Sequence, residues 1–116
     1  MRRPGACLAA VVAAVLVAGC GSSDVSRAVG ARCDDSSECD DRCLLPIDGW
    51  PGGFCTLSCD ASDDCPDDAA CVEDEGGACL FRCELAADCG FLGTGWRCNA
   101  RPARPAGGTE MVCVPS

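Results

Sequence analysis

The hydrophobic pattern divides the chain into two unlike parts. Residues 6–17 form one continuous apolar run, preceded by Arg2 and Arg3. A run of this length suits the apolar stretch of an export signal and is too short to cross a bilayer as a helix. After it, large apolar residues occur singly among acidic, glycine and cysteine positions, and no second stretch is long enough to span a membrane. We therefore expect residues 1–19 to be a signal peptide and the remainder to be exported.

The second part is organised by a cysteine repeat. The cysteines of residues 33–113 fall into three groups of four that start 26 and 24 residues apart. Self-similarity at such a period is typical of tandem structural units. The predicted repeats are 33–58, 59–82 and 83–113, and their cysteines follow the pattern Cys33-x5-Cys39-x3-Cys43-x11-Cys55, Cys59-x5-Cys65-x5-Cys71-x7-Cys79 and Cys83-x5-Cys89-x8-Cys98-x14-Cys113.

Each repeat predicts the same small elements. The first gap is acidic at both ends (34–38, 60–64 and 84–88), and the last gap holds a glycine pair (52–53, 76–77 and 107–108). We expect the acid directly after the first cysteine to cap a single helical turn. We expect the glycine pair to reverse the chain with φ > 0. Segments around the third and fourth cysteines then pair as a short hairpin, such as Cys71-Val72 with Ala78-Cys79, and no helix exceeds two turns.

Two stretches are expected to lack regular structure. Residues 21–32 are polar and predict a flexible tether behind Cys20, so that the cysteine-rich domain comprises residues 33–116. The last gap of the third group, 99–112, is the longest and contains Pro102 and Pro105. We expect it to be a mobile loop.

Composition points to a fold held by disulfides. Fourteen of the 116 residues are cysteine, well above the roughly 8–10% that marks disulfide scaffolds. The few large apolar residues of the exported part are spread along the chain, so we expect no single deep core. We predict a small disulfide-rich fold with little regular secondary structure, made of short hairpins and single helical turns in three tandem four-cysteine repeats.

Four cysteines within a repeat can pair in three ways. We favour first-to-third and second-to-fourth bridges, because crossed bridges tie the acidic turn onto both arms of the hairpin, whereas nested or sequential bridges leave a flap. The alternative is bridges that cross the repeat boundaries through the Cys55/Cys59 and Cys79/Cys83 junctions. The favoured pairs are Cys33–Cys43, Cys39–Cys55, Cys59–Cys71, Cys65–Cys79, Cys83–Cys98 and Cys89–Cys113.

Charge excludes several classes of function. Without residues 1–19 the chain has seven arginines against 18 acidic residues, a net charge of −11. Such a surface repels nucleic acid and anionic head groups. The chain contains no Lys, His or Tyr, and these are common general bases and partners of activated nucleophiles. We therefore expect no enzyme activity and no cofactor.

The spacing of the cysteine and acidic residues gives little support for a metal site. No two cysteines are separated by two residues, which is the usual zinc knuckle. Asp60, Asp63 and Asp64 form a weak calcium candidate in an acidic stretch that also holds Asp67 and Asp68. The spacing is not that of a calcium loop and no bidentate Glu follows. We expect a solvated acidic turn.

The most apolar loop of the domain is the candidate for partner contacts. It runs from Leu44 to Pro51, and its candidate contacts are Leu44, Leu45, Ile47 and Trp50. Trp50 is an aromatic anchor of the kind found at interface hot spots. Local burial of this loop is the alternative, and for Trp96 we favour packing against the adjacent bridge.

The residues before Cys20, Leu16-Val17-Ala18-Gly19-Cys20, resemble the lipobox of bacterial lipoproteins, with Val17 where the family prefers Leu. The resemblance implies cleavage before Cys20, diacylation of its thiol and acylation of the new amino group. Because Gly21 is not Asp, it also implies the outer membrane. Cys7 is then lost with the signal peptide and Cys20 takes the lipid, which leaves twelve cysteines for six bridges.

The C-[DE]-x3-[DE]-C stretches and the glycine before each fourth cysteine resemble Dickkopf-type N-terminal domains and repeat-containing, cysteine-rich bacterial lipoproteins, over residues 33–113. No functional motif of those families is matched. We expect a monomeric, lipid-anchored interaction or envelope module with a protein or glycan partner. The alternative is a secreted protease inhibitor that presents Leu44–Ile47.

Overall fold

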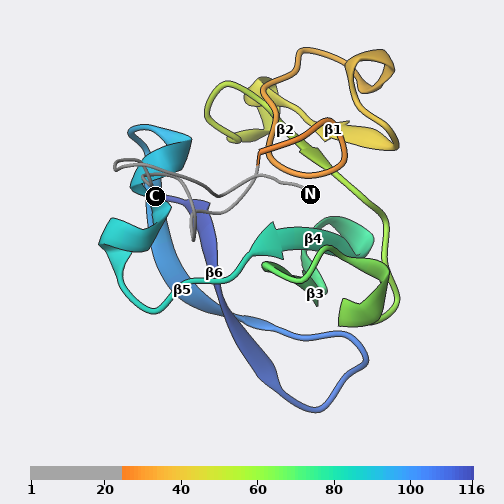
Figure 1. The fold of residues 1–116 in the computed structure, drawn as a ribbon, viewed down its shortest axis with the longest axis vertical. Helices are drawn as coiled ribbons and strands as arrows, with labels where there is room; N and C mark the ends of the chain where they lie inside the picture. The colour runs from red at the N-terminus through yellow and green to blue at the C-terminus, as the bar shows by residue number, and fades with distance from the viewer. Residues whose placement is uncertain (1–24) are drawn as a thin grey trace, which may run out of the picture.

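The computed structural model describes residues 25–116 (Figure 1). The expected signal peptide, Cys7 and Cys20 lie outside the described residues. Within them the secondary structure comprises three antiparallel hairpins and five short 3-10 helices. The strands are β1 (Arg42–Leu44), β2 (Phe54–Thr56), β3 (Ala69–Val72), β4 (Ala78–Phe81), β5 (Trp96–Pro102) and β6 (Thr109–Pro115); the helices are η1 (Ser36–Glu38), η2 (Pro46–Asp48), η3 (Ser62–Asp64), η4 (Asp74–Gly76) and η5 (Ala86–Leu92).

The predicted fold class is confirmed. Each repeat contributes one acidic 3-10 turn and one hairpin, in the order that the sequence predicts. Cys71 pairs with Cys79 and Val72 with Ala78, as expected. The helix η5 spans seven residues, and at about three residues per 3-10 turn it slightly exceeds the predicted limit of two turns.

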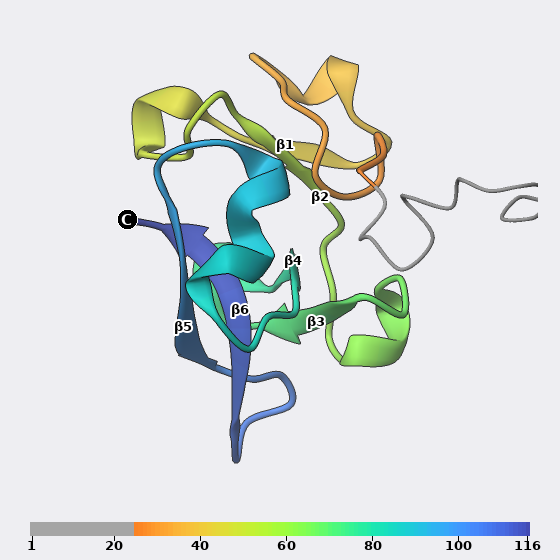
Figure 2. The same cartoon turned by 60° about the vertical axis from the view of Figure 1, so that its left-hand side comes forward.

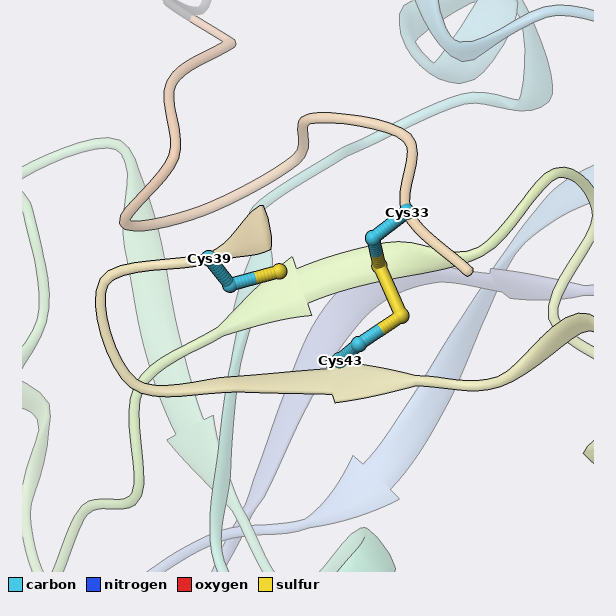
Figure 3. Close-up of side chains that lie close together, drawn as sticks. All are labelled: Cys33, Cys39 and Cys43. Atoms are coloured by element: carbon cyan, nitrogen blue, oxygen red, sulfur yellow. A yellow bond between two sulfur atoms is a disulfide. The ribbon is translucent and has the colours of Figure 1, made fainter. Parts of the chain in front are cut away.

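The six disulfides follow the crossed scheme, first to third and second to fourth within each repeat. The third and fourth cysteines stand directly opposite each other on the hairpin, as Cys43 does to Cys55. Directly opposite residues of antiparallel strands project from the same face. The turn that carries the first two cysteines covers this face, so both of its sulfurs reach the hairpin (Figure 3).

The glycine pairs reverse the chain and also allow a close backbone contact. Gly53 and Gly77 have φ of 78° and 108°. A Cβ on Gly53 would lie 1.8 Å from the carbonyl oxygen of Cys33, and a Cβ on Gly77 would lie 2.5 Å from that of Cys59. In the first two repeats the second glycine of the pair therefore packs on the first cysteine of its own repeat. In the third repeat nothing lies within 4 Å of such a Cβ on Gly108.

The third hairpin differs because its strands are seven residues long. The predicted mobile loop over 99–112 is wrong: the strands pair as far as Pro102 and Thr109. Beyond them the chain pairs with the second repeat, where the N–H of Glu73 donates to the carbonyl of Pro102 at 2.8 Å and that of Arg104 donates to the carbonyl of Cys71 at 3.0 Å. Pairing with β3 therefore orders the segment that its proline and glycine content marked as a loop.

The predicted tether is also shorter than expected. Val29 is fully buried in the core. The N–H of Gly30 donates to the carbonyl of Cys55 at 2.8 Å, and the N–H of Cys55 donates to the carbonyl of Ala31 at 2.9 Å. Residues 30–31 thus lie along the free edge of β2, and the fold begins before the first cysteine of the repeats.

The expectation that no single core would form is wrong. One cluster of buried side chains runs through all three repeats and includes Leu44, Leu80 and Val112. Its centre is aromatic: the ring centroid of Phe54 lies 5.9 Å from that of Phe81 and 5.4 Å from that of Trp96. The core is shared because isolated bridges, such as Ser58 to Ala78 and Arg82 to Val112, join each hairpin to the next and bring their inner faces together.

Candidate functional site

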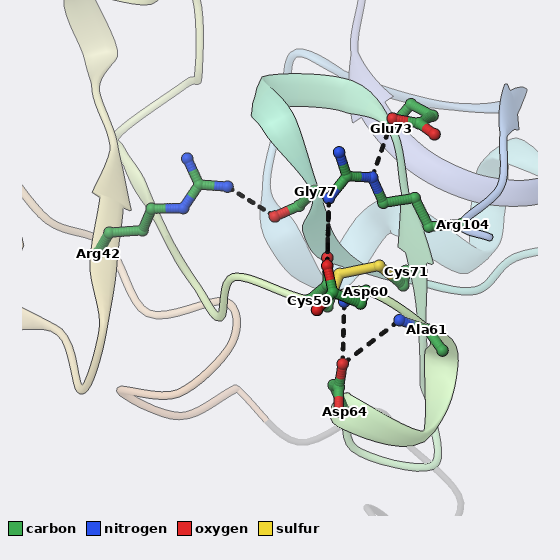
Figure 4. Close-up of polar contacts among 9 residues, drawn as sticks. All are labelled: Arg42, Cys59, Asp60, Ala61, Asp64, Cys71, Glu73, Gly77 and Arg104. Carbon is green, nitrogen blue, oxygen red and sulfur yellow. Dashed lines mark hydrogen bonds and ion pairs between the residues drawn. A yellow bond between two sulfur atoms is a disulfide. The ribbon is translucent and has the colours of Figure 1, made fainter. Parts of the chain in front are cut away.

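In the acidic turns, the carboxylate that caps the turn is not the one that the sequence predicts. The acid before the second cysteine, not the one after the first, accepts the backbone hydrogen bonds. The carboxylate of Asp64 accepts from the N–H of Asp60 at 2.9 Å and of Ala61 at 3.3 Å (Figure 4). Asp88 accepts likewise from Glu84 and Leu85, at 2.8 and 2.9 Å. A side chain in the third helical position reaches back to the free N–H groups at the start of the turn.

The first repeat shows a variant of the same turn. Glu38 accepts from the N–H of Asp34 at 2.6 Å, and Asp35 accepts from the N–H of Ser37 at 2.9 Å. The hydroxyl and backbone N–H of Ser37 lower the pKa of Asp35 below its ordinary 3.8. The N–H groups of Glu84 and Leu85 lower the pKa of Asp88 in the same way. Both carboxylates are therefore ionised at neutral pH and are not suited to act as general acids.

The structure does not gather the weak calcium candidates Asp60, Asp63 and Asp64 at one point. The Asp64 carboxylate binds the backbone of its own turn, and the Asp60 carboxylate is 3.6 Å from the guanidinium of Arg104. Within residues 25–116, the only groups of three potential metal ligands close to one another consist of cysteine sulfurs. Every one of these sulfurs is in a disulfide, so none is a thiolate ligand.

The predicted contact loop is only partly available to a partner. Leu44 and Trp50 are each 4% exposed and belong to the core, so the interpretation of Trp50 as an interface anchor is wrong. The 3-10 turn η2, closed by Gly49 with φ of 99°, returns the chain toward the core. Leu45 is half-buried, and Ile47 alone among the four candidates is exposed, at 89%.

Trp96 joins the same aromatic cluster. Its ring centroid lies 6.0 Å from that of Trp50 and 5.4 Å from that of Phe54. Trp96 is half-buried and packs against the core together with Cys98. The two tryptophans thus pack against each other at the join between the first and third repeats.

Two arginines connect the repeats, and sequence reasoning missed their role. Arg42 donates to the carbonyl of Gly77 at 2.7 Å (Figure 4). Arg104 donates to the carbonyl of Cys59 at 3.2 Å and to the carboxylate of Glu73 at 2.9 Å. Both side chains therefore bind the second repeat from its neighbours, and a long-range contact of this kind leaves no local pattern in the sequence.

A hollow of about 660 Å³, open to solvent, lies beside the acidic turn of the third repeat. An ion pair between Arg82 and Glu110, at 2.7 Å, stands on its wall. The Asp88 carboxylate that lines it is already bound to the backbone. The hollow is therefore a polar surface depression with most of its charges satisfied. Its lining residues are Arg82, Cys83, Glu84, Asp88, Thr109, Glu110 and Met111.

Comparison of the chain with protein-family models, with curated proteins and with solved structures finds no match. Among residues 25–116, no helix is long and apolar enough to cross a membrane. The described residues thus form a cross-linked body with three acidic turns and an exposed apolar loop tip at Ile47.

Proposed function

We propose that this chain is an exported protein of the bacterial cell envelope, anchored in the lipid bilayer through acylated Cys20, that acts as a non-catalytic interaction module. The observation that carries the proposal is the complete pairing of the twelve cysteines between residues 33 and 113. Disulfides persist in oxidising compartments outside the cytosol. The apolar run and lipobox-like sequence of residues 1–20 supply a route to such a compartment.

The outer membrane is the proposed location, and a protein or glycan is the proposed partner class. The rigid body supports this role, because loops held by disulfides and a shared core lose little conformational entropy on binding. The acidic surface disfavours nucleic acid as the partner.

Cellular fractionation of a matched pair of chains tests the anchor. The natural chain should partition with membranes and take up radiolabelled fatty acid, while Cys20→Ser should be exported without label or should keep its leader. Cys7→Ser is the matched control, because the leader that carries Cys7 is removed. Fatty-acid labelling of Cys20→Ser at the natural level would overturn the proposed anchor.

A secreted protease inhibitor is the second candidate, and the exposure of Ile47 on a turn fixed by Pro46 and Gly49 favours it. An inhibitor of this kind blocks a serine or cysteine protease at a stoichiometric ratio. Ile47→Asp should abolish that inhibition, whereas Leu85→Asp, at another exposed apolar residue, should preserve it. If the natural chain leaves both protease classes active, this second candidate is excluded.

A further inference from the structure

The segment that follows Cys20 joins the fold almost at once. Ser26 donates its N–H to the carbonyl of Val29 at 2.8 Å, and Val29 is completely buried. Gly30 and Ala31 then bond to Cys55 on the edge of β2. The body therefore starts at Val25 and Ser26, and only residues 21–24 separate it from Cys20.

This length limits how far the body can stand from an anchor. From Cys20 to Val25 the fully extended chain spans about 17 Å. The body itself measures 44 × 31 × 25 Å. If Cys20 is acylated, as the proposed function requires, the body cannot move away from the bilayer by even its own smallest dimension.

The start of the body is also the site of a partly exposed apolar row. A Cβ on Gly30 would lie 2.6 Å from the ring of Phe81 and 3.4 Å from a methyl of Val25. The ring centroid of Phe91 is 5.1 Å from that of Phe81. Phe81 is fully buried, whereas Val25 is 48% exposed and Phe91 is 41% exposed. We define this row, Val25–Phe81–Phe91, as the N-terminal apolar patch.

We propose that the N-terminal apolar patch rests on the lipid bilayer surface beside the acylated Cys20. The inference depends on the proposed anchor and adds an orientation to it. Apolar and aromatic side chains are favoured at the boundary between head groups and acyl chains. A local anchor raises their effective concentration there, so a small patch suffices. Because the chain is strongly acidic, the surface that it fits is zwitterionic rather than anionic.

This orientation leaves the far end of the molecule free. Residues 25–32, drawn in orange, lie in the half that holds β1 and β2, and the tip of the β5–β6 hairpin lies at the other end of the long axis (Figures 1 and 2). The tip holds Gly107 and Gly108, which have nothing near their Cα positions. It therefore points away from the membrane and is open to a partner.

Paramagnetic broadening in nanodiscs tests the orientation. The lipidated chain is placed in phosphatidylcholine nanodiscs that contain a lipid with a nitroxide on its head group. We expect the signals of Val25 and Phe91 to broaden strongly and the amide signals of Gly107 and Gly108 to remain sharp. Uniform broadening over the body, or the strongest broadening at Gly107 and Gly108, would overturn the inference.

Two variants separate the patch from the anchor. A Gly-Ser segment inserted between Ser23 and Asp24, long enough to span roughly 25 Å as a coil, should remove most of the broadening at Phe91 without altering any folded residue. Val25→Asp keeps the short link to Cys20, so it should spread the broadening more evenly over the body. Ile47→Asp, at an exposed apolar residue outside the patch, should leave the pattern of the natural chain. If Val25→Asp leaves the pattern of paramagnetic broadening unchanged, the inferred contact between the N-terminal apolar patch and the bilayer is wrong. The intact mass of the same sample distinguishes failure of the orientation from failure of the anchor. A chain without acyl groups on Cys20 would contradict the proposed anchor, whatever the orientation.

Discussion

The hydroxyl oxygen of Ser36 accepts a hydrogen bond from the backbone N–H of Cys43 at 3.0 Å. Ser62 accepts from Cys71 in the same way in the second repeat, at 3.1 Å. Both serines stand three positions after the first cysteine, and both bonds tie the acidic turn to the outer edge of the hairpin's first strand. The corresponding position in the third repeat is Ala86, facing Cys98, and among the described residues no side chain is bonded to the N–H of Cys98.

Ala86→Ser should therefore stabilise the protein. The first-to-third bridges have Cα separations of 6.0, 5.9 and 5.9 Å in the three repeats, so the turn stands at the same distance from the strand in each. A new hydroxyl acceptor should add about 0.5–1.5 kcal/mol to the free energy of unfolding. Guanidinium unfolding with the disulfides intact measures it. Ala87→Ser, one residue further along the same turn, is the control and should change little; an equal gain in both variants would contradict the assignment.

Gly53→Ala should be strongly destabilising. The new Cβ would overlap the carbonyl oxygen of Cys33 at 1.8 Å, and the backbone has φ of 78°. Left-handed strain and overpacking together should cost about 2 kcal/mol or more. Gly108→Ala is the matched control at the same repeat position, since it has no neighbour within 4 Å and no positive φ. Comparable losses of unfolding free energy in the two variants would disprove the close packing of the first repeat.

Thr56→Val should weaken the join between the first two repeats. The fully buried hydroxyl of Thr56 donates to the carbonyl of Cys79 at 2.8 Å and accepts from its N–H at 2.9 Å. Valine keeps the shape and leaves both backbone groups of Cys79 without this partner, which should cost about 1–3 kcal/mol. The exposed Thr109→Val is the control. Thr56→Ser should retain most of the stability, and a Thr56→Val chain as stable as the natural one would refute the role of the hydroxyl.

The acidic turns should give the stability a specific dependence on pH. The pKa of Asp88 is lowered in the folded state by the N–H groups of Glu84 and Leu85. A lowered folded pKa means that the carboxylate stabilises the fold above its unfolded pKa, near the ordinary 3.8, and that this contribution disappears as the pH falls through the folded value. Carboxyl NMR titration should show Asp88 and Asp35 titrating below their ordinary range.

The variant Asp88→Asn checks this pH effect independently. Its amide oxygen still accepts from the backbone but carries no charge, so the loss of stability as the pH falls below the ordinary carboxyl pKa of 3.8 should shrink. Asp63→Asn, on the exposed side of a neighbouring turn, is the control and should leave the pH profile intact. A titration of Asp88 at or above pH 4 would argue against the backbone hydrogen bonds.

The local features of the fold could be predicted from the sequence because each repeat is specified within about two dozen residues. Cysteine spacing defined the groups of four, and the crossed bridges were favoured among the possible pairings because they tie the acidic turn to both arms of the hairpin. The pairing of Cys71 with Cys79 followed from the glycine pair between them. The cap was assigned to the wrong acid, because Asp60 and Asp64 stand at the two ends of the segment between Cys59 and Cys65. Only the geometry of the turn shows that Asp64 is the acceptor.

The contacts between repeats could not be predicted in the same way. Ala103 pairs with Val72, and Arg104 binds Cys59, over separations that no local pattern marks. For the same reason the sequence predicts a tether before Cys33: Val29 is buried in a core cluster whose other members, such as Phe54 and Phe81, come much later in the chain. For Trp50 the sequence left partner contact and local burial both open, because one of its core partners, Trp96, belongs to the third repeat and no local pattern marks that contact.

The most direct test of the whole account is the intact mass of the natively produced protein before and after reduction. We predict a chain that begins at Cys20, carries acyl groups, shows no alkylation between Cys33 and Cys113 under native conditions, and gains twelve hydrogens when its six bridges are reduced. A mass that includes residues 1–19, lacks fatty acid or gains fewer hydrogens would contradict the account of a lipid-anchored, fully cross-linked module.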